Sequence, residues 1–187
     1  MIRRHGLGLI AGMLAASAGL CLRPAQADTP AHRVSATQIR YAVAQRFPLR
    51  YPVGGLFDVA VQTPVLRFMA ADNRLGAQAA VEAGGPALRR QYPGTLDVDF
   101  ALRYEPSDMT LRAHQIRLIA LQMDGLPPQA QALLDAYAPA LARQFWAEVV
   151  LHTLQPQDLA LPNAMGLQPG AIDVVVDGLV IRFTPRS

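Results

Sequence analysis

The stretch GTLDVDFALRY, residues 94–104, alternates almost without error between apolar and polar side chains. Such alternation predicts a β-strand with one face toward an apolar interior and the other toward water. The apolar face would carry Leu96, Val98, Phe100, Leu102 and Tyr104, and the polar face Thr95, Asp97, Asp99, Ala101 and Arg103. The function therefore depends on whether the apolar face touches only the protein's own core or also a bound molecule.

The segments before this stretch show the same alternation and predict an antiparallel sheet. Residues 56–63 and 74–83 each alternate, and residues 72–73 form the turn before the second segment. Pro64 interrupts the alternation, which indicates a bulge or an edge position.

The segments after this stretch predict further strands. Residues 109–124 form a long return strand whose apolar parity slips between Ala113 and Ile116. Long strands with such a slip are typical of a strongly twisted, curled sheet. The chain closes with a strand at residues 171–183, in which residues 177–178 form a bulge or a turn.

Two helices complete the predicted fold. A capping box at residues 35–38 starts a short N-terminal helix that Pro48 ends. Prolines at residues 127–128 open a long helix that His152 closes, and Pro139 should kink it. We therefore predict an α+β fold, with a strongly curled antiparallel sheet of about four to six strands wrapped around a long kinked C-terminal helix.

The N-terminal segment has the features of an export signal. A charged start precedes the uncharged apolar run 6–22, and small residues at 25 and 27 form a cleavage site. We expect a signal peptide over residues 1–27, cut after Ala27, and a single periplasmic domain over residues 28–187.

Two alternatives stay open for this segment. The apolar run is close to the lower length limit of a membrane span, so it could instead remain as an anchor. Cys21 also lies where a lipoprotein cysteine would be acylated. Leu20, however, stands where a lipoprotein signal requires a small residue. Membrane anchoring and lipidation at Cys21 are therefore secondary hypotheses.

Charge argues against a polyanionic partner. All 17 basic residues are arginine, against 14 acidic residues, and removal of residues 1–27 takes away Arg3, Arg4 and Arg23 but no acid. The remaining domain has a formal net charge of zero, so we expect no nucleic acid partner. Removal of Cys21 also excludes a disulfide framework.

No motif for catalysis, metal binding or cofactor binding is visible in the sequence. His32, His114 and His152 are scattered, and Asp97 and Asp99 fit a solvated strand face better than an acid pair. We therefore expect no catalytic residues, no metal and no cofactor, and a protein that is not an enzyme. A hydrolase with an unreadable site is the remaining enzymatic alternative.

Several short motifs occur in a particular order: RFP (46–48), GLFD (55–58), TPVLRF (63–68), GTLDVDFALRY (94–104), RLIALQMDGLPPQ (117–129) and the terminal strand. Their order and spacing resemble the YceB-like family of bacterial envelope proteins, a domain of unknown function. The resemblance covers about residues 35–183. That family's fold is similar to the tubular lipid-binding (TULIP) superfamily, in which a curled sheet wraps a long helix and holds acyl chains in the seam.

The resemblance implies a lipid or fatty-acyl ligand in an apolar slot. The alternative is a structural or adaptor module of the envelope, with a filled core and a protein partner. Membrane surface contact and a homodimer stay open. The expected slot residues are Phe57, Val59, Val61, Leu66, Phe68, Leu75, Ala77, Ala79, Val98, Phe100, Leu102, Leu118, Leu134, Tyr137, Leu141 and Phe145.

Overall fold

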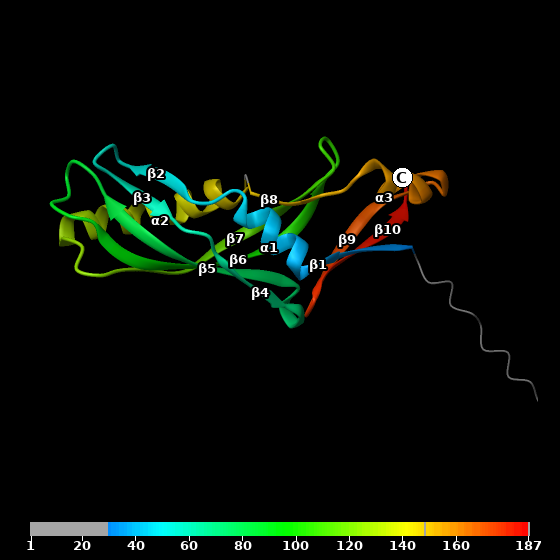
Figure 1. Ribbon diagram of the computed structural model, residues 1–187, viewed down its shortest axis with the longest axis horizontal. Coiled ribbons are helices and arrows are strands. Elements are labelled where there is room, and N and C mark those ends of the chain that lie inside the picture. Colours follow the sequence, from blue (N-terminus) through cyan, green and yellow to red (C-terminus); the bar gives the residue numbers. More distant parts are fainter. Residues whose placement is uncertain (1–29, 148, 187) are drawn as a thin grey trace, which may run out of the picture.

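The computed structural model describes residues 30–147 and 149–186, and most of them lie in strands (Figure 1). The predicted signal peptide lies outside these residues and stays a prediction. No helix among the described residues is long and apolar enough to cross a membrane.

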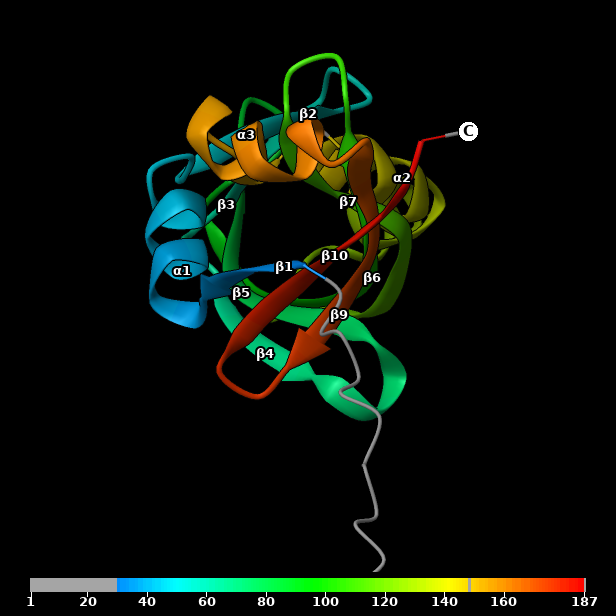
Figure 2. The ribbon, with the colours of Figure 1, turned by 90° about the vertical axis from the view of Figure 1, so that its right-hand side faces the viewer.

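A curled antiparallel sheet of seven strands, the large sheet, forms the body of the molecule (Figures 1 and 2). Its strand order is β2-β3-β5-β6-β7-β8, and β4 pairs with β5 beside β3. The strands are β2 (Leu49–Val53), β3 (Phe57–Val61), β4 (Val65–Met69), β5 (Arg74–Gly84), β6 (Tyr92–Glu105), β7 (Thr110–Met123) and β8 (Val150–Thr153).

A second sheet of three strands, the small sheet, extends from one end of the body (Figure 1). Its order is β1-β10-β9, so that strands from the two ends of the described chain pair with each other. These strands are β1 (Ala31–Ser35), β9 (Leu167–Val175) and β10 (Gly178–Pro185). The turn predicted at residues 177–178 is confirmed, because β9 ends and β10 begins there.

The strand predicted at residues 94–104 is confirmed as the centre of the large sheet. It lies within β6 and pairs with β5 on one side and β7 on the other. Leu96, Val98 and Phe100 are buried, as the alternation predicts. Asp99 is also buried, at 4% exposure, so the prediction of a solvated face is wrong at this position.

Both interruptions of the alternation are confirmed as irregularities in the sheet. β3 and β4 pair with successive parts of β5, and the three residues 62–64 separate them. The pairing of β6 with β7 shifts between Asp99 and Ala101, opposite Gln115, which has a positive φ of 49°. A bulge at this point lets the long strands bend around the body.

The predicted fold class is wrong, because strands dominate and no long kinked C-terminal helix forms the axis of a single sheet. The helix that begins at Pro128 is α2 (Pro128–Ala147), and β8, α3 (Pro156–Ala164), β9 and β10 all follow it. It packs against β7 and β2, which lie toward opposite ends of the strand order of the large sheet. The ten strands of the described residues also exceed the predicted four to six.

Short elements account for most of the missed structure. β1, β2 and β8 have four or five residues each, too few for their alternation to be distinctive. His152, expected to close a helix, lies in β8, and residues 156–164, for which no helix is predicted, form α3.

The capping box is confirmed at the start of α1 (Ala36–Ala44). The backbone amide of Gln38 donates to Ser35 Oγ at 3.2 Å, and the Ser35 amide donates to Gln38 Oε1 at 2.9 Å. These bonds satisfy amides that the first helical turn leaves unpaired. The helix then buries Ile39 and Val43 in the core.

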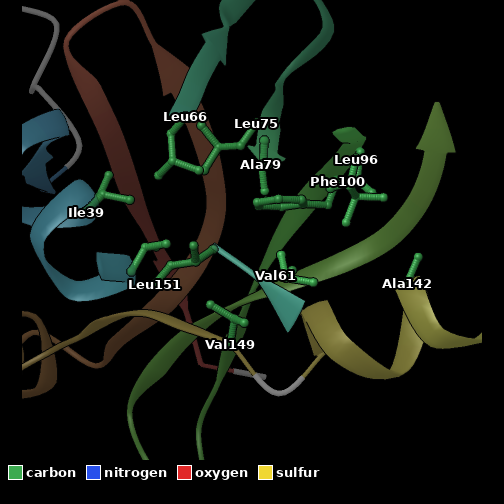
Figure 3. Close-up of a cluster of buried hydrophobic side chains, with 14 of the residues drawn as sticks. Ile39, Val61, Leu66, Leu75, Ala79, Leu96, Phe100, Ala142, Val149 and Leu151 are labelled. Atoms are coloured by element: carbon green, nitrogen blue, oxygen red, sulfur yellow. The ribbon is translucent and has the colours of Figure 1, made fainter. Parts of the chain in front are cut away.

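A continuous hydrophobic core runs through the body. Figure 3 shows Ile39 from α1 pointing toward a common centre with side chains of the large sheet, among them Leu66 from β4 and Leu151 from β8. Phe100 and Leu75 pair across β6 and β5 and are fully buried there. The core therefore joins α1 and the large sheet into one packed unit.

Candidate ligand-binding site

An apolar cavity of about 50 Å³, the α2 cavity, lies between α2 and the concave face of the large sheet. Leu134, Ala138 and Ala142 of α2 are buried and spaced by four residues, so they share one face of the helix. Two of the three are alanines, which leave the space unfilled. The cavity is lined by Tyr51, Val59, Val61, Val81, Leu96, Leu121, Leu134, Ala138 and Ala142.

The lining is almost entirely hydrocarbon. Five strands of the large sheet contribute one or two side chains each, and Tyr51 brings the only side-chain polar atom among the lining residues. An apolar cavity of this kind favours an alkyl chain over water. Its volume is well below the roughly 300–1,000 Å³ of a small-molecule pocket, so α2 must move away from the sheet to admit a chain.

The structure brings three of the predicted slot residues, Val59, Val61 and Leu134, to this cavity. Leu102 lines a separate groove, and Tyr137 is exposed. The side chains of Leu141 and Phe145 lie outside what the structure describes. Phe68 and Leu118 are half-buried against the core, and the remaining predicted residues are buried in it: Phe57, Leu66, Leu75, Ala77, Ala79, Val98 and Phe100.

Six lining residues were missed by the sequence prediction. Ala138 and Ala142 could have been found, because they follow Leu134 at helical spacing. Val81 and Leu96 lie on strand faces expected to be apolar, but the alternation cannot separate cavity from core. Tyr51 lies in a strand that gave no clear signal, and Leu121 lies beyond a register shift between β6 and β7 that the sequence does not predict.

An ion cluster around the buried carboxylate of Asp99 joins β5, β6 and β7 of the large sheet. Arg74 Nε donates to Asp99 Oδ1 at 2.7 Å, and Arg117 Nη2 donates to Asp99 Oδ2 at 2.7 Å. Arg74 also donates to the carbonyl oxygen of Gln115 in the β7 bulge, at 2.6 Å. The hydrogen bond from Arg117, followed by the bond and charge of Arg74, outweighs burial and lowers the pKa of Asp99. We call Arg74, Asp99 and Arg117 the ion cluster.

A histidine pair links the two sheets. His32 of β1 and His152 of β8 stack with their ring centroids 6.3 Å apart, and Asp158 Oδ1 lies 3.9 Å from His32 Nδ1. Burial, and then the charge of His32, lowers the pKa of His152 below its ordinary value. In the part of the chain that the structure describes, no group of three or more His, Cys, Asp or Glu residues could hold a metal ion.

No family model matches the sequence. No curated protein matches it either. Among solved structures, the chain is similar to one described as "Crystal structure of lipopolysaccharide binding protein", with a TM-score of 0.29 and 12% sequence identity. The match covers 83% of this chain and 50% of that one, so the chain spans half the length of the structure it matches. A likeness of this degree establishes neither a shared ligand nor membership of the YceB-like family, which stays a prediction.

Proposed function

We propose that this chain is an exported envelope protein that binds a lipid or another hydrophobic ligand between α2 and the large sheet. The observation that carries the proposal is the hydrocarbon lining of the α2 cavity, built from one helix face and five strands. The YceB-like resemblance of the sequence points to the same class of ligand. The proposed role is binding, without catalysis and without a cofactor.

The alanine face of α2 supports opening of the cavity. A helix that packs through Ala138 and Ala142 buries less apolar area than one that packs through leucines. Each buried methylene stabilises packing by about 0.8 kcal/mol, so each Leu-to-Ala difference lowers the cost of separation by roughly 2 kcal/mol. An acyl chain that replaces these contacts restores the buried area.

A structural or adaptor role is the second candidate, and the small volume of the α2 cavity favours it. A cavity of about 50 Å³ within a packed core needs no ligand to be stable. In this reading the large sheet acts as a scaffold and the protein works through surface contacts.

Direct ligand detection separates the two candidates. Purified protein is extracted with organic solvent and the extract is analysed by mass spectrometry, and the delipidated protein is then titrated with a fluorescent fatty acid. Lipid at close to one mole per mole, together with saturable binding of the probe, supports the first candidate. Clean extracts from several preparations and no saturable binding support the second.

Two leucine substitutions on α2 provide a matched pair for the same titration. Ala138→Leu fills the cavity, whereas Ala140→Leu adds the same side chain to an exposed position two residues away. We expect Ala138→Leu to weaken probe binding about tenfold or more, which corresponds to about 1.4 kcal/mol or more, and Ala140→Leu to leave it unchanged. Equal affinities in the two variants would place the probe elsewhere.

A further inference from the structure

A second and larger opening, the β6–β9 groove, lies where the two sheets diverge. Its volume is about 610 Å³, and its walls are the end of the β6–β7 hairpin on one side and β9 with α3 on the other (Figure 1). The residues that line it are Leu102, Arg103, Tyr104, Pro106, Met109, Leu159, Asn163, Gln168, Pro169, Gly170, Ala171, Ile172 and Arg186.

Two strand edges without a strand partner border this groove. β6 pairs with β7 as far as Glu105, but its pairing with β5 ends at Phe100, because β5 begins at Arg74. Within the described chain, residues 101–105 of β6 therefore pair with a strand on one side only. β9 is likewise the outer strand of the small sheet, paired with β10 alone. Such edges present backbone N–H and C=O groups that can pair with another strand.

The outer edge of β9 already takes part in strand-like hydrogen bonding at one end. Asn73 Nδ2 donates to the carbonyl oxygen of Ile172 at 3.0 Å, and the amide of Val174 donates to Asn73 Oδ1 at 2.6 Å. The side-chain amide of Asn73 thus occupies the position of a neighbouring strand beside residues 172–174. Residues 168–171, which line the groove, lie beyond this cap.

The charge of the groove is positive. Arg103 and Arg186 line it, and no acidic residue is among its lining residues. Arg186 Nη2 donates to Asn163 Oδ1 at 2.6 Å, and no carboxylate of the described residues lies within 4 Å of this guanidinium. Arg103 has Glu105 Oε2 at 3.4 Å and is half exposed. Two guanidinium groups with free donors fit a carboxylate ligand.

We propose that the β6–β9 groove binds an extended peptide segment that carries an acidic side chain, by strand addition along residues 101–105 of β6. The peptide lies beside residues 101–105 of β6, where β5, which begins at Arg74, provides no partner. Arg103 and Arg186 bind the carboxylate of the peptide. Alternate side chains of the peptide contact the apolar wall of Leu102, Met109 and Ile172. A lipid tail fits less well, because it cannot pair with the backbone groups of the strand edge.

Peptide selection tests the proposal on the folded full chain. A displayed library of random linear octapeptides is selected against the wild-type protein and against an Arg103→Glu variant, and the best binder is labelled for fluorescence anisotropy. We expect acidic, β-branched sequences to be enriched on the wild-type protein only. We also expect slower hydrogen exchange of residues 101–105 in the complex, because strand pairing protects backbone amides. Absence of enrichment over the variant would overturn the proposal.

Two controls separate strand addition from simple charge attraction. Arg103→Gln should weaken the selected peptide about tenfold. Arg182→Gln, on an exposed arginine of β10 outside the groove, should leave its affinity unchanged. N-methylation of alternate peptide amides should abolish binding in one register and spare the other. Two outcomes would instead assign the groove to an anionic amphiphile. Either both sets of N-methylated peptides bind equally well, or oleate displaces the peptide completely.

Discussion

The α2 cavity and the β6–β9 groove share strand β6 but differ in size, in charge and in the strand pairing around them. Leu96, in the first half of β6, lines the small apolar cavity, and Arg103, in the second half, lines the large charged groove. In the first half, β5 and β7 pair with both edges of β6, and only side chains face the cavity. In the second half, β5 is absent and one backbone edge has no paired strand among the described residues. Strand pairing therefore decides which half of β6 offers backbone groups, and the two arginines give the groove its charge.

The ion cluster lies at the boundary between these two halves. Asp99 precedes the last residue of β6 that pairs with β5, and Arg74 is the first residue of β5. Arg74 also donates to the Gln115 carbonyl, at the bulge where the register of β6 and β7 shifts. The cluster thus lies at the point where β6 loses its pairing with β5 and keeps only its pairing with β7.

The largest predicted effect comes from Asp99→Asn, because it leaves the buried Arg74 charge without a counter-charge. We expect the free energy of unfolding to fall by about 3–5 kcal/mol, measured by urea denaturation at pH 7. The double variant Arg74→Leu with Asp99→Leu should recover part of this loss. A double variant as unstable as the single one would show that charge compensation is not the cause.

The same substitution should change the acid stability. The pKa of Asp99 is lowered in the folded state, so the unfolded chain binds a proton first as the pH falls. The contribution of Asp99 is present above its ordinary pKa of 3.8 and is lost as the pH falls through the lower folded value. The unfolding free energy of the wild type should therefore drop more steeply below about pH 4 than that of Asp99→Asn.

A comparable or smaller loss is expected from Leu134→Ala, which enlarges the α2 cavity from the helix side. Truncation of a buried leucine typically lowers the free energy of unfolding by about 2–5 kcal/mol. The fluorescent fatty acid should bind to this variant at least as tightly as to the wild type. Leu161→Ala in α3 removes the same atoms from an exposed site and is the control. Loss of stability together with loss of probe binding would mean that Leu134 contacts the ligand directly.

A third and weaker effect concerns the histidine pair that joins the sheets. Because burial lowers the pKa of His152, its neutral form stabilises the fold above the ordinary pKa of about 6.5. This contribution is lost as the pH falls through the folded pKa. Between pH 7.5 and pH 5, the melting temperature of the wild type should fall more than that of His152→Gln. Parallel curves for the two proteins would show that the pair does not control acid sensitivity.

The smallest effect is predicted for Arg103→Gln in the β6–β9 groove. Its guanidinium is half exposed, and its only described ion pair is with Glu105 at 3.4 Å. An exposed pair of this kind contributes about 0–1 kcal/mol, so the melting temperature should barely change while peptide affinity falls. A large loss of stability would instead identify the arginine as part of the structural framework.

The sequence predicted the long central strands well, because their periodicity extends over enough residues to be unambiguous. The interruption at Pro64 marked the break between β3 and β4, and the slip near Ile116 marked a bulge in the pairing of β6 with β7. The helix that starts at Pro128 was assigned the wrong role in the fold. Periodicity shows that one face of a helix is buried, but not whether a sheet surrounds it or lies on one side.

The candidate sites were harder to predict, because each depends on contacts between distant segments. Asp99 has the spacing of a solvated residue, and only the approach of Arg74 and Arg117 explains its burial. The β6–β9 groove depends on the position at which β5 begins and on β9. β9 begins more than sixty residues after the end of β6. No local sequence pattern indicates that the edge of a strand lacks a pairing partner.

The pairing of β1 with β10 has a consequence for how the chain folds. Ala31 lies opposite Arg182, so this one contact closes a loop that contains almost all of the described residues. The entropy lost on loop closure grows with loop length, and contacts between residues so far apart in the sequence are slow to form. A chain emerging from its N-terminus must therefore keep β1 unpaired until the last strand is available. The small sheet, and with it one wall of the groove, is expected to be the last part of the molecule to assemble.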